Sequence, residues 1–170
     1  MLTIQCTKKL AAELDISLSN EKPERFNPLY CWHTHIFTFN RRKCVLVMNN
    51  ETRYNFMIFG LVKADFKRFD DFILKHISAN LLADGMAQEW VDKYLQECED
   101  LSYTPTSDRS IISQINEMIM MAQYKMEDNI IKSGNPEIDQ VNRMLNNRFV
   151  FLKLPKLYSG VTMKDALQNL

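Results

Sequence analysis

Apolar and polar residues alternate with a period of two along residues 30–59. This period is typical of β-strands, whose successive side chains point to opposite faces of a sheet. We expect three strands joined by short turns, at 31–39, 43–48 and 53–59. A two-residue turn at Asn40-Arg41 would place Phe37 opposite Cys44. The pattern therefore predicts an antiparallel meander.

Beyond Gly60 the period changes to 3.6, which indicates amphipathic helices. They are expected in five segments, at about 65–83, 87–98, 107–126, 136–145 and 162–170. The third segment has a very broad apolar stripe that includes Met118, Met120 and Met121. That helix is expected either to lie at the centre of the fold or to contact a partner. The stretch before it contains Pro105 and is expected to be a loop.

Both ends of the chain contain further candidate strands. Apolar residues alternate in 2–6, which predicts a strand that runs into a helix at 8–14, with Thr7 as its N-cap. Residues 149–154 form a second candidate strand, which would return to the sheet. No repeat or linker interrupts the chain.

The second face of the meander is expected to be too apolar to face water. Its side chains would come from all three strands: Trp32, Thr34, Ile36, Val45, Val47, Asn55, Met57 and Phe59. Either helices cover this face and make the sheet a middle layer, or a partner protein or a second copy covers it.

Length and composition agree with a single folded unit. The chain has 170 residues, of which 46% are hydrophobic and 25% are charged. A chain of this size can bury a substantial core in one domain. We expect residues 1–170 to form one α+β domain, in which an antiparallel meander sheet of three to five strands packs against four or five helices.

Charge and cysteine content narrow the class of protein. Lys plus Arg and Asp plus Glu both number 21, which argues against a general nucleic-acid coat or a membrane-surface protein but leaves local basic patches open. No secretory signal and no run of about 20 apolar residues is present, so we expect a cytoplasmic protein without a membrane segment. The four cysteines include no C-x-x-C pair and are interpreted as buried thiols.

The first candidate for chemistry is Cys31-Trp32-His33-Thr34-His35. Alternate residues of a strand lie on one face about 6.6 Å apart, so His33 and His35 have a spacing that suits metal ligands or a catalytic pair. The same face continues into apolar residues, which favours structural histidines. We identify no group that would orient a metal ligand, so no metal and no cofactor are expected.

The second candidate is the cationic run Arg41-Arg42-Lys43 at the hairpin tip, with further cations at Lys8, Lys9, Lys63, Lys67 and Arg68. Such a run can bind phosphates, or it can simply keep a sheet edge solvated. Together with His33 or His35 it would suit metal-independent RNA cleavage. His35 and Arg41 lie about 20 Å apart on a straight strand, so that chemistry needs a long substrate or Lys8 and Lys9 beside the histidines.

Several short motifs resemble one family of small bacterial proteins known only as a domain of unknown function. They are CTKKL near the start, Trp32-His33, RRKCVL from Arg41, and Asp108-Arg109-Ser110. In that family the position of His35 is often Asn, which implies a shared role for His33 and the cations Arg41, Arg42 and Lys43 instead. The resemblance implies a bacterial, cytosolic setting, with the protein encoded by the cell or by a mobile element, and no defined activity.

Two functions fit these observations, and the residues leave open whether the chain is an enzyme. The first is a non-enzymatic interaction or regulatory protein that binds a protein partner or a second copy through the apolar sheet face or the Met-rich helix. The alternative is a nucleic-acid-binding protein or ribonuclease that uses His33 with Arg41, Arg42 and Lys43. An enzyme should hold His33 in a cleft with cations, whereas an interaction protein should show a packed His33 and an uncovered apolar patch.

Overall fold

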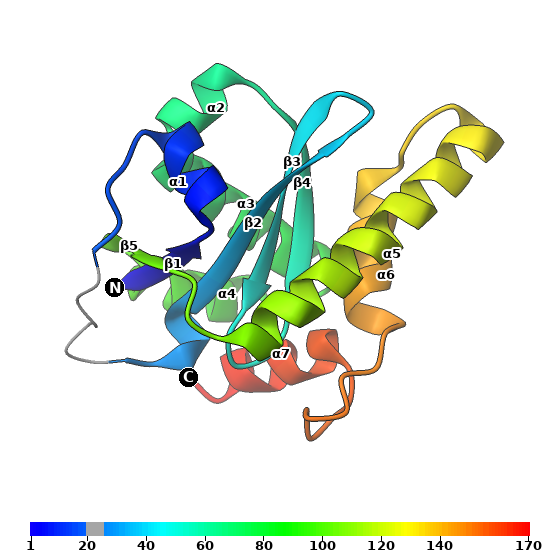
Figure 1. The fold of residues 1–170 in the computed structure, drawn as a ribbon. Helices are drawn as coiled ribbons and strands as arrows, with labels where there is room; N and C mark the ends of the chain where they lie inside the picture. The colour runs from blue at the N-terminus through cyan, green and yellow to red at the C-terminus, as the bar shows by residue number, and fades with distance from the viewer. Residues whose placement is uncertain (20–25) are drawn as a thin grey trace.

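The computed structural model describes residues 1–19 and 26–170, which form an α+β fold around a sheet with the strand order β4-β3-β2-β1-β5 (Figure 1). The five strands are β1 (Leu2–Cys6), β2 (Cys31–Phe39), β3 (Arg42–Asn49), β4 (Asn55–Leu61) and β5 (Leu101–Pro105). The described residues also form seven α-helices: α1 (Lys8–Leu14), α2 (Lys63–Lys67), α3 (Phe69–Ala83), α4 (Gln88–Gln96), α5 (Arg109–Ser133), α6 (Ile138–Asn147) and α7 (Ser159–Gln168). None of these helices is long and apolar enough to cross a lipid bilayer.

The sheet is mixed. Strands β2, β3 and β4 form the predicted antiparallel meander, whereas β1 pairs in parallel with both β2 and β5. The expectation of an antiparallel sheet is therefore wrong for this half. The loop predicted around Pro105 is strand β5, at the edge of the sheet. An edge strand tolerates Pro because one side of its backbone has no neighbouring strand to bond.

The helical part also departs from the expectation of four or five helices. The single helix predicted from residue 65 is two helices, α2 and α3, because the backbone leaves the helical conformation at Arg68, with φ −122° and ψ 35°. Residues 149–154 do not return to the sheet, since the backbone there makes only an isolated bridge between Val150 and Tyr158. Thr7 does cap α1, as expected, because its hydroxyl oxygen accepts the N–H of Leu10 at 3.3 Å.

The first hairpin has the predicted register. Asn40 and Arg41 have φ values of 46° and 62°, the left-handed conformations that a two-residue hairpin turn needs. Phe37 accordingly pairs with Cys44. The alternation of side chains along β2 and β3 is therefore as predicted.

The third strand faces the other way from the prediction. Met48 pairs with Asn55, so the residues expected beside Trp32, which are Asn55, Met57 and Phe59, lie on the opposite face of the sheet. The turn between β3 and β4 contains Arg53 with φ 58°, and this reversal shifts the alternation by one residue. Spacing in the sequence does not reveal such a shift.

Helices cover both faces of the sheet, which is the middle layer of the fold (Figure 1). One face packs against α1, α3, α4 and α7, in a core that includes Trp32, Val47 and Phe56. The other face packs against α5 and α6, in a core that includes Leu46 and Met57. The apolar sheet face proposed as a docking surface is therefore buried within the chain, and a partner cannot reach it.

Two asparagines of α6 close the free edge of β4. The side-chain amide of Asn142 accepts the Met57 N–H at 2.8 Å and donates to the Met57 carbonyl at 3.0 Å. Asn146 does the same for Asn55, at 2.9 and 2.7 Å. Asn142 and Asn146 are four residues apart on a helix, which is a rise of about 6 Å, and Asn55 and Met57 are two residues apart on a strand, which is about 6.8 Å. The two spacings match closely enough for each asparagine to face one strand residue. α6 thus takes the place of a neighbouring strand.

Replacing Asn142 with Leu should lower the free energy of unfolding by about 2–6 kcal/mol. The change leaves the N–H and C=O of Met57 buried without partners, at about 1–3 kcal/mol each. Urea unfolding followed by circular dichroism measures the difference. The exposed Gln140 of the same helix provides the control, since Gln140→Leu should change stability by less than about 0.5 kcal/mol. Equal losses in both variants would contradict the role of Asn142.

Candidate functional site

His33 is fully buried and belongs to a closed ring of four hydrogen-bonded residues. Its Nδ1 lies 2.7 Å from Oδ1 of Asn50, whose Nδ2 donates to Oε1 of Gln5 at 2.6 Å. Nε2 of Gln5 donates to the Ser107 hydroxyl at 2.9 Å, and the Ser107 N–H donates to Nε2 of His33 at 3.4 Å. The ring joins β1, β2, the turn after β3 and the segment just before α5.

This ring fixes the protonation state of His33. Oδ1 of Asn50 is an acceptor, so Nδ1 of His33 carries the proton, and Nε2 is the acceptor for Ser107. Burial is the main effect and lowers the pKa of His33; the hydrogen bond with Asn50 and the Asp108 carboxylate act in the opposite direction, and the Arg53 cation adds the smallest lowering effect. A neutral imidazole with both nitrogens engaged holds the strand ends together.

His35 shares the sheet face of His33 but has different surroundings. It is half-buried, and burial and the nearby Lys9 cation both lower its pKa. The structure therefore brings a lysine of α1 to His35, one of the two conditions set for RNA cleavage, but not to the buried His33. Within residues 1–19 and 26–170, no three His, Cys, Asp or Glu side chains gather in a group that could hold a metal ion.

The hairpin tip divides its three cations between two roles. Arg41 and Arg42 are exposed. Lys43 lies 2.7 Å from the carboxylate of Glu13 in α1 and 5.6 Å above the ring of Phe66 in α2. Lys43 thus ties both helices to the sheet, whereas the two arginines remain at the surface.

These contacts gather cations from distant parts of the chain at one end of the sheet. α1, α2 and the turn between β2 and β3 all lie at this end (Figure 1). We call it the basic end and define it by eight residues: Lys8, Lys9, Arg41, Arg42, Lys43, Lys63, Lys67 and Arg68. The segments 8–15, 40–43 and 62–68 contain these eight cations and three acidic residues. Because the whole chain is neutral, the rest of it is acidic.

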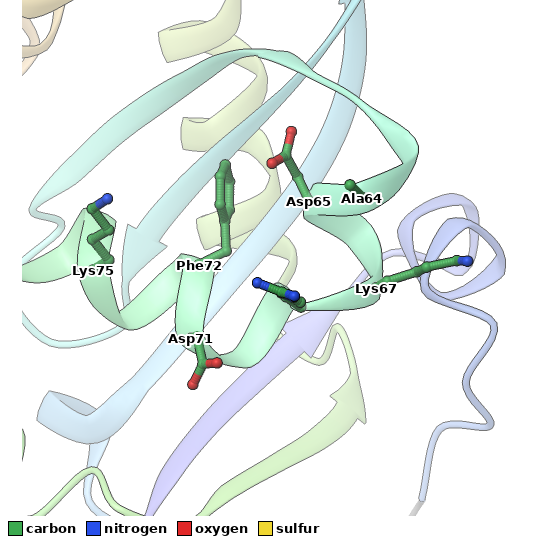
Figure 2. A pocket seen from close by; sticks show the side chains of 7 residues that line it. Ala64, Asp65, Lys67, Asp71, Phe72 and Lys75 are labelled. Carbon is green, nitrogen blue, oxygen red and sulfur yellow. The ribbon is translucent and has the colours of Figure 1, made fainter.

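A hollow of about 620 Å³ lies on α2 and α3 beside the basic end (Figure 2). Its lining combines cations, carboxylates and one aromatic ring: Ala64, Asp65, Lys67, Arg68, Asp71, Phe72 and Lys75. The break between α2 and α3 at Arg68 forms its corner.

The sequence identifies all eight cations of the basic end but does not show that they lie together. Lys63, Lys67 and Arg68 were recognised as a separate group, but their proximity to the hairpin depends on contacts such as Lys43 with Phe66. Lys75 and Phe72 were missed as site residues. The available signal was that Phe72 follows Arg68 by four residues and Lys75 follows Asp71 by four residues, which is the spacing of neighbours on a helix surface.

Comparison with known proteins adds a family and no activity. A protein-family model described as "Domain of unknown function (DUF6933)" matches residues 3–160. No curated protein matches the sequence.

His33 should remain neutral, with the proton on Nδ1, as the pH falls below the ordinary histidine pKa of about 6.5. The unfolded chain takes up a proton in that range and the folded chain does not. Stability is therefore unaffected by His33 above about pH 7 and falls by up to about 1.4 kcal/mol per pH unit below 6.5, until the folded pKa is reached. Nitrogen-detected NMR of the imidazoles measures the tautomer and its titration.

The variant Asn50→Asp provides the control for this measurement. A carboxylate beside Nδ1 favours the imidazolium, so the pKa of His33 should rise relative to the native chain. An imidazole of His33 that titrates at or above its ordinary pKa in the native chain would contradict the neutral ring.

Proposed function

We propose that this chain, which belongs to the family described as Domain of unknown function (DUF6933), is a non-enzymatic regulatory protein that binds nucleic acid through its basic end. One observation carries the proposal: eight cations from separate segments of the sequence gather at one end of a chain that is neutral overall. A local basic surface attracts a phosphate backbone even when the net charge of the protein is zero.

The hairpin tip is the best-placed contact for phosphates. Arg41 and Arg42 are exposed, and among the described residues neither takes part in an ion pair. The guanidinium group presents a planar fork of donors that fits phosphate oxygens. Since Lys43 is already paired with Glu13, it supports the tip more than it binds a ligand.

The arrangement of the histidines favours binding over cleavage. Ribonuclease chemistry without a metal needs an accessible base and acid beside the phosphate. Of the two histidines on this strand, His33 is fully buried with both ring nitrogens engaged, and His35 is half-buried with the Lys9 cation acting on it. One half-buried histidine on the strand leaves the second proton-transfer group unfilled, which supports binding without turnover.

A second candidate function is binding of a protein partner through α5. The exposed side of this helix carries Met120, Tyr124 and Ile131, with exposed fractions of 56%, 74% and 85%. Their spacing of four and seven residues places them on one stripe, whereas an ordinary surface helix is polar there. The exposed Glu117 and Glu127 flank the stripe, which favours a partner helix with an apolar stripe and basic flanks.

For either function we propose that the protein acts in the bacterial cytoplasm and is encoded by the cell or by a mobile element. All four cysteines are buried free thiols, as expected for a reducing compartment. Burial raises the pKa of Cys6 and Cys31 to about 11, so these thiols stay protonated at neutral pH.

The double variant Arg41→Gln/Arg42→Gln should bind labelled single-stranded RNA about tenfold more weakly at 0.1 M salt, because two phosphate contacts are lost. The slope of log affinity against log salt should fall by about 1.4, at about 0.7 per phosphate. Fluorescence polarisation over a salt series measures both quantities. The native chain should leave the RNA intact on a denaturing gel.

The matched control is Lys153→Gln/Lys164→Gln, which removes two exposed cations outside the basic end. It should change neither the affinity nor the slope beyond the effect of overall charge. Equal losses in both double variants, or no RNA binding by the native chain, would sink the proposal.

For the second candidate, a photo-reactive phenylalanine at position 124 should give a discrete crosslinked species in extracts of the native host. Met120→Glu/Ile131→Glu should remove it, because two charges then interrupt the apolar stripe. The same probe at the exposed position 140 is the control. A species that persists in the double variant would rule out docking on this stripe.

A further inference from the structure

We infer that the hollow between α2 and α3 holds one unpaired guanine base of a single-stranded nucleic acid. This inference rests on the proposed function and names its ligand. The hollow adjoins the basic end, and Lys67 and Arg68 belong to both (Figure 2). A strand whose phosphates contact the basic end can therefore reach the hollow with a neighbouring base.

The wall of the hollow offers an aromatic ring. Phe72 is half-buried, and its ring centroid lies 4.5 Å from that of His76 and 6.4 Å from that of Phe69. These contacts fix the ring on α3, where Figure 2 shows it on the same side of the helix as Asp65, with Asp71 pointing to the other side. A fixed ring at the surface provides a stacking platform for a base, and such platforms are common in proteins that bind single strands.

Two carboxylates distinguish the hollow from a simple anion site. Oδ2 of Asp65 accepts the Val62 N–H at 2.8 Å, and no described residue donates to its other oxygen. Asp71 is exposed and has no hydrogen-bond donor within the described chain. These carboxylates oppose the attraction of Lys67, Arg68 and Lys75 for a ligand that is purely anionic, such as phosphate, an acidic peptide or an anionic lipid headgroup. A ligand that carries both phosphate and hydrogen-bond donors suits the combination.

Guanine is the base whose edge fits a carboxylate best. Its Watson–Crick edge presents two adjacent donors, N1–H and the 2-amino group, which match the two oxygens of one carboxylate. Its O6 is an acceptor for a cation such as Arg68 or Lys75. Adenine, cytosine and uracil each present only one donor group on that edge. The edge is free only when the base is unpaired, so the ligand is single-stranded.

The cations around the hollow are available for the flanking phosphates. Among the described residues, Lys67, Arg68 and Lys75 form no ion pair within 4.0 Å. All three are exposed. They line the same hollow as the aromatic ring and the carboxylates, so the phosphates next to a bound base have cations within reach.

The test is fluorescence polarisation of the full chain with labelled ten-nucleotide oligouridylates that carry a single central G, A, C or U. The native chain should bind the G oligonucleotide about tenfold more tightly than the others. Phe72→Leu should remove most of that gain, because base stacking on one ring contributes a factor of roughly 10. The salt slope should stay unchanged, since no phosphate contact is lost.

Asp65→Asn separates base recognition from charge, because the amide oxygen can still accept the Val62 N–H. It removes one negative charge beside the phosphates, so binding of the U oligonucleotide should stay equal or rise while the preference for G disappears. Tyr124→Leu, which removes an exposed aromatic ring from α5, is the matched control and should retain the native preference. Circular dichroism melting confirms that each variant is folded.

The outcomes separate the inference from the proposed function. If Arg41→Gln/Arg42→Gln weakens binding but Phe72→Leu and Asp65→Asn leave every oligonucleotide unchanged, the guanine site is wrong and the basic end still binds nucleic acid. If the native chain binds no oligonucleotide, both are wrong. Tighter binding to vesicles containing anionic lipid, lost in Phe72→Leu, would assign the hollow to a membrane surface and overturn the inference.

Discussion

The open edge of β4 imposes the hydrogen-bonding requirement on which the layered fold depends. Once α6 packs beside this edge, the outward N–H and C=O groups of Asn55 and Met57 are cut off from water and need partners. Asn142 and Asn146 supply them, at a helical spacing that matches the strand. With α6 fixed there, α5 and α6 can cover one face of the sheet while α1, α3, α4 and α7 cover the other.

Because helices cover both faces of the sheet, the charged and polar side chains that a ligand can reach lie at the ends of the sheet and on the outer surfaces of the helices. The histidine that stands out in the sequence, His33, lies inside and connects the strand ends through neutral hydrogen bonds. The exposed cations instead collect where α1 and α2 meet the hairpin. Lys43 links these parts, because one ammonium group contacts both Glu13 and the ring of Phe66.

Local patterns predicted local structure well. The alternation around Asn40 and Arg41 predicted the hairpin and its register, and Thr7 predicted the start of α1. Prediction failed where a distant segment decides the outcome. β5 needs β1 as its neighbour, and Pro105 alone suggested a loop. The faces of β4 depend on a left-handed residue, Arg53, which the alternation of side chains does not report.

The candidate site also combines features that the sequence predicts with features that it does not. The presence of Arg and Lys runs could be predicted, because such runs are visible in any sequence. The gathering of these cations at one end of the sheet could not be predicted, since it depends on how α1 and α2 pack on the sheet. Phe72 and the carboxylates of the hollow were hidden for another reason: on a helix, an aromatic residue among charges has the same pattern as an ordinary boundary residue.

The amide groups on α6 also bear on how copies of the protein behave in a crowded cell. An unpaired strand edge is a template on which another chain can add a strand, and growth from such edges leads to aggregates. Asn142 and Asn146 occupy that template with side chains that cannot propagate it. Chemical deamidation of either residue would place a carboxylate against a backbone carbonyl, expel α6 from the edge and expose the template. The integrity of these two amide groups thus keeps the edge of β4 closed to other chains.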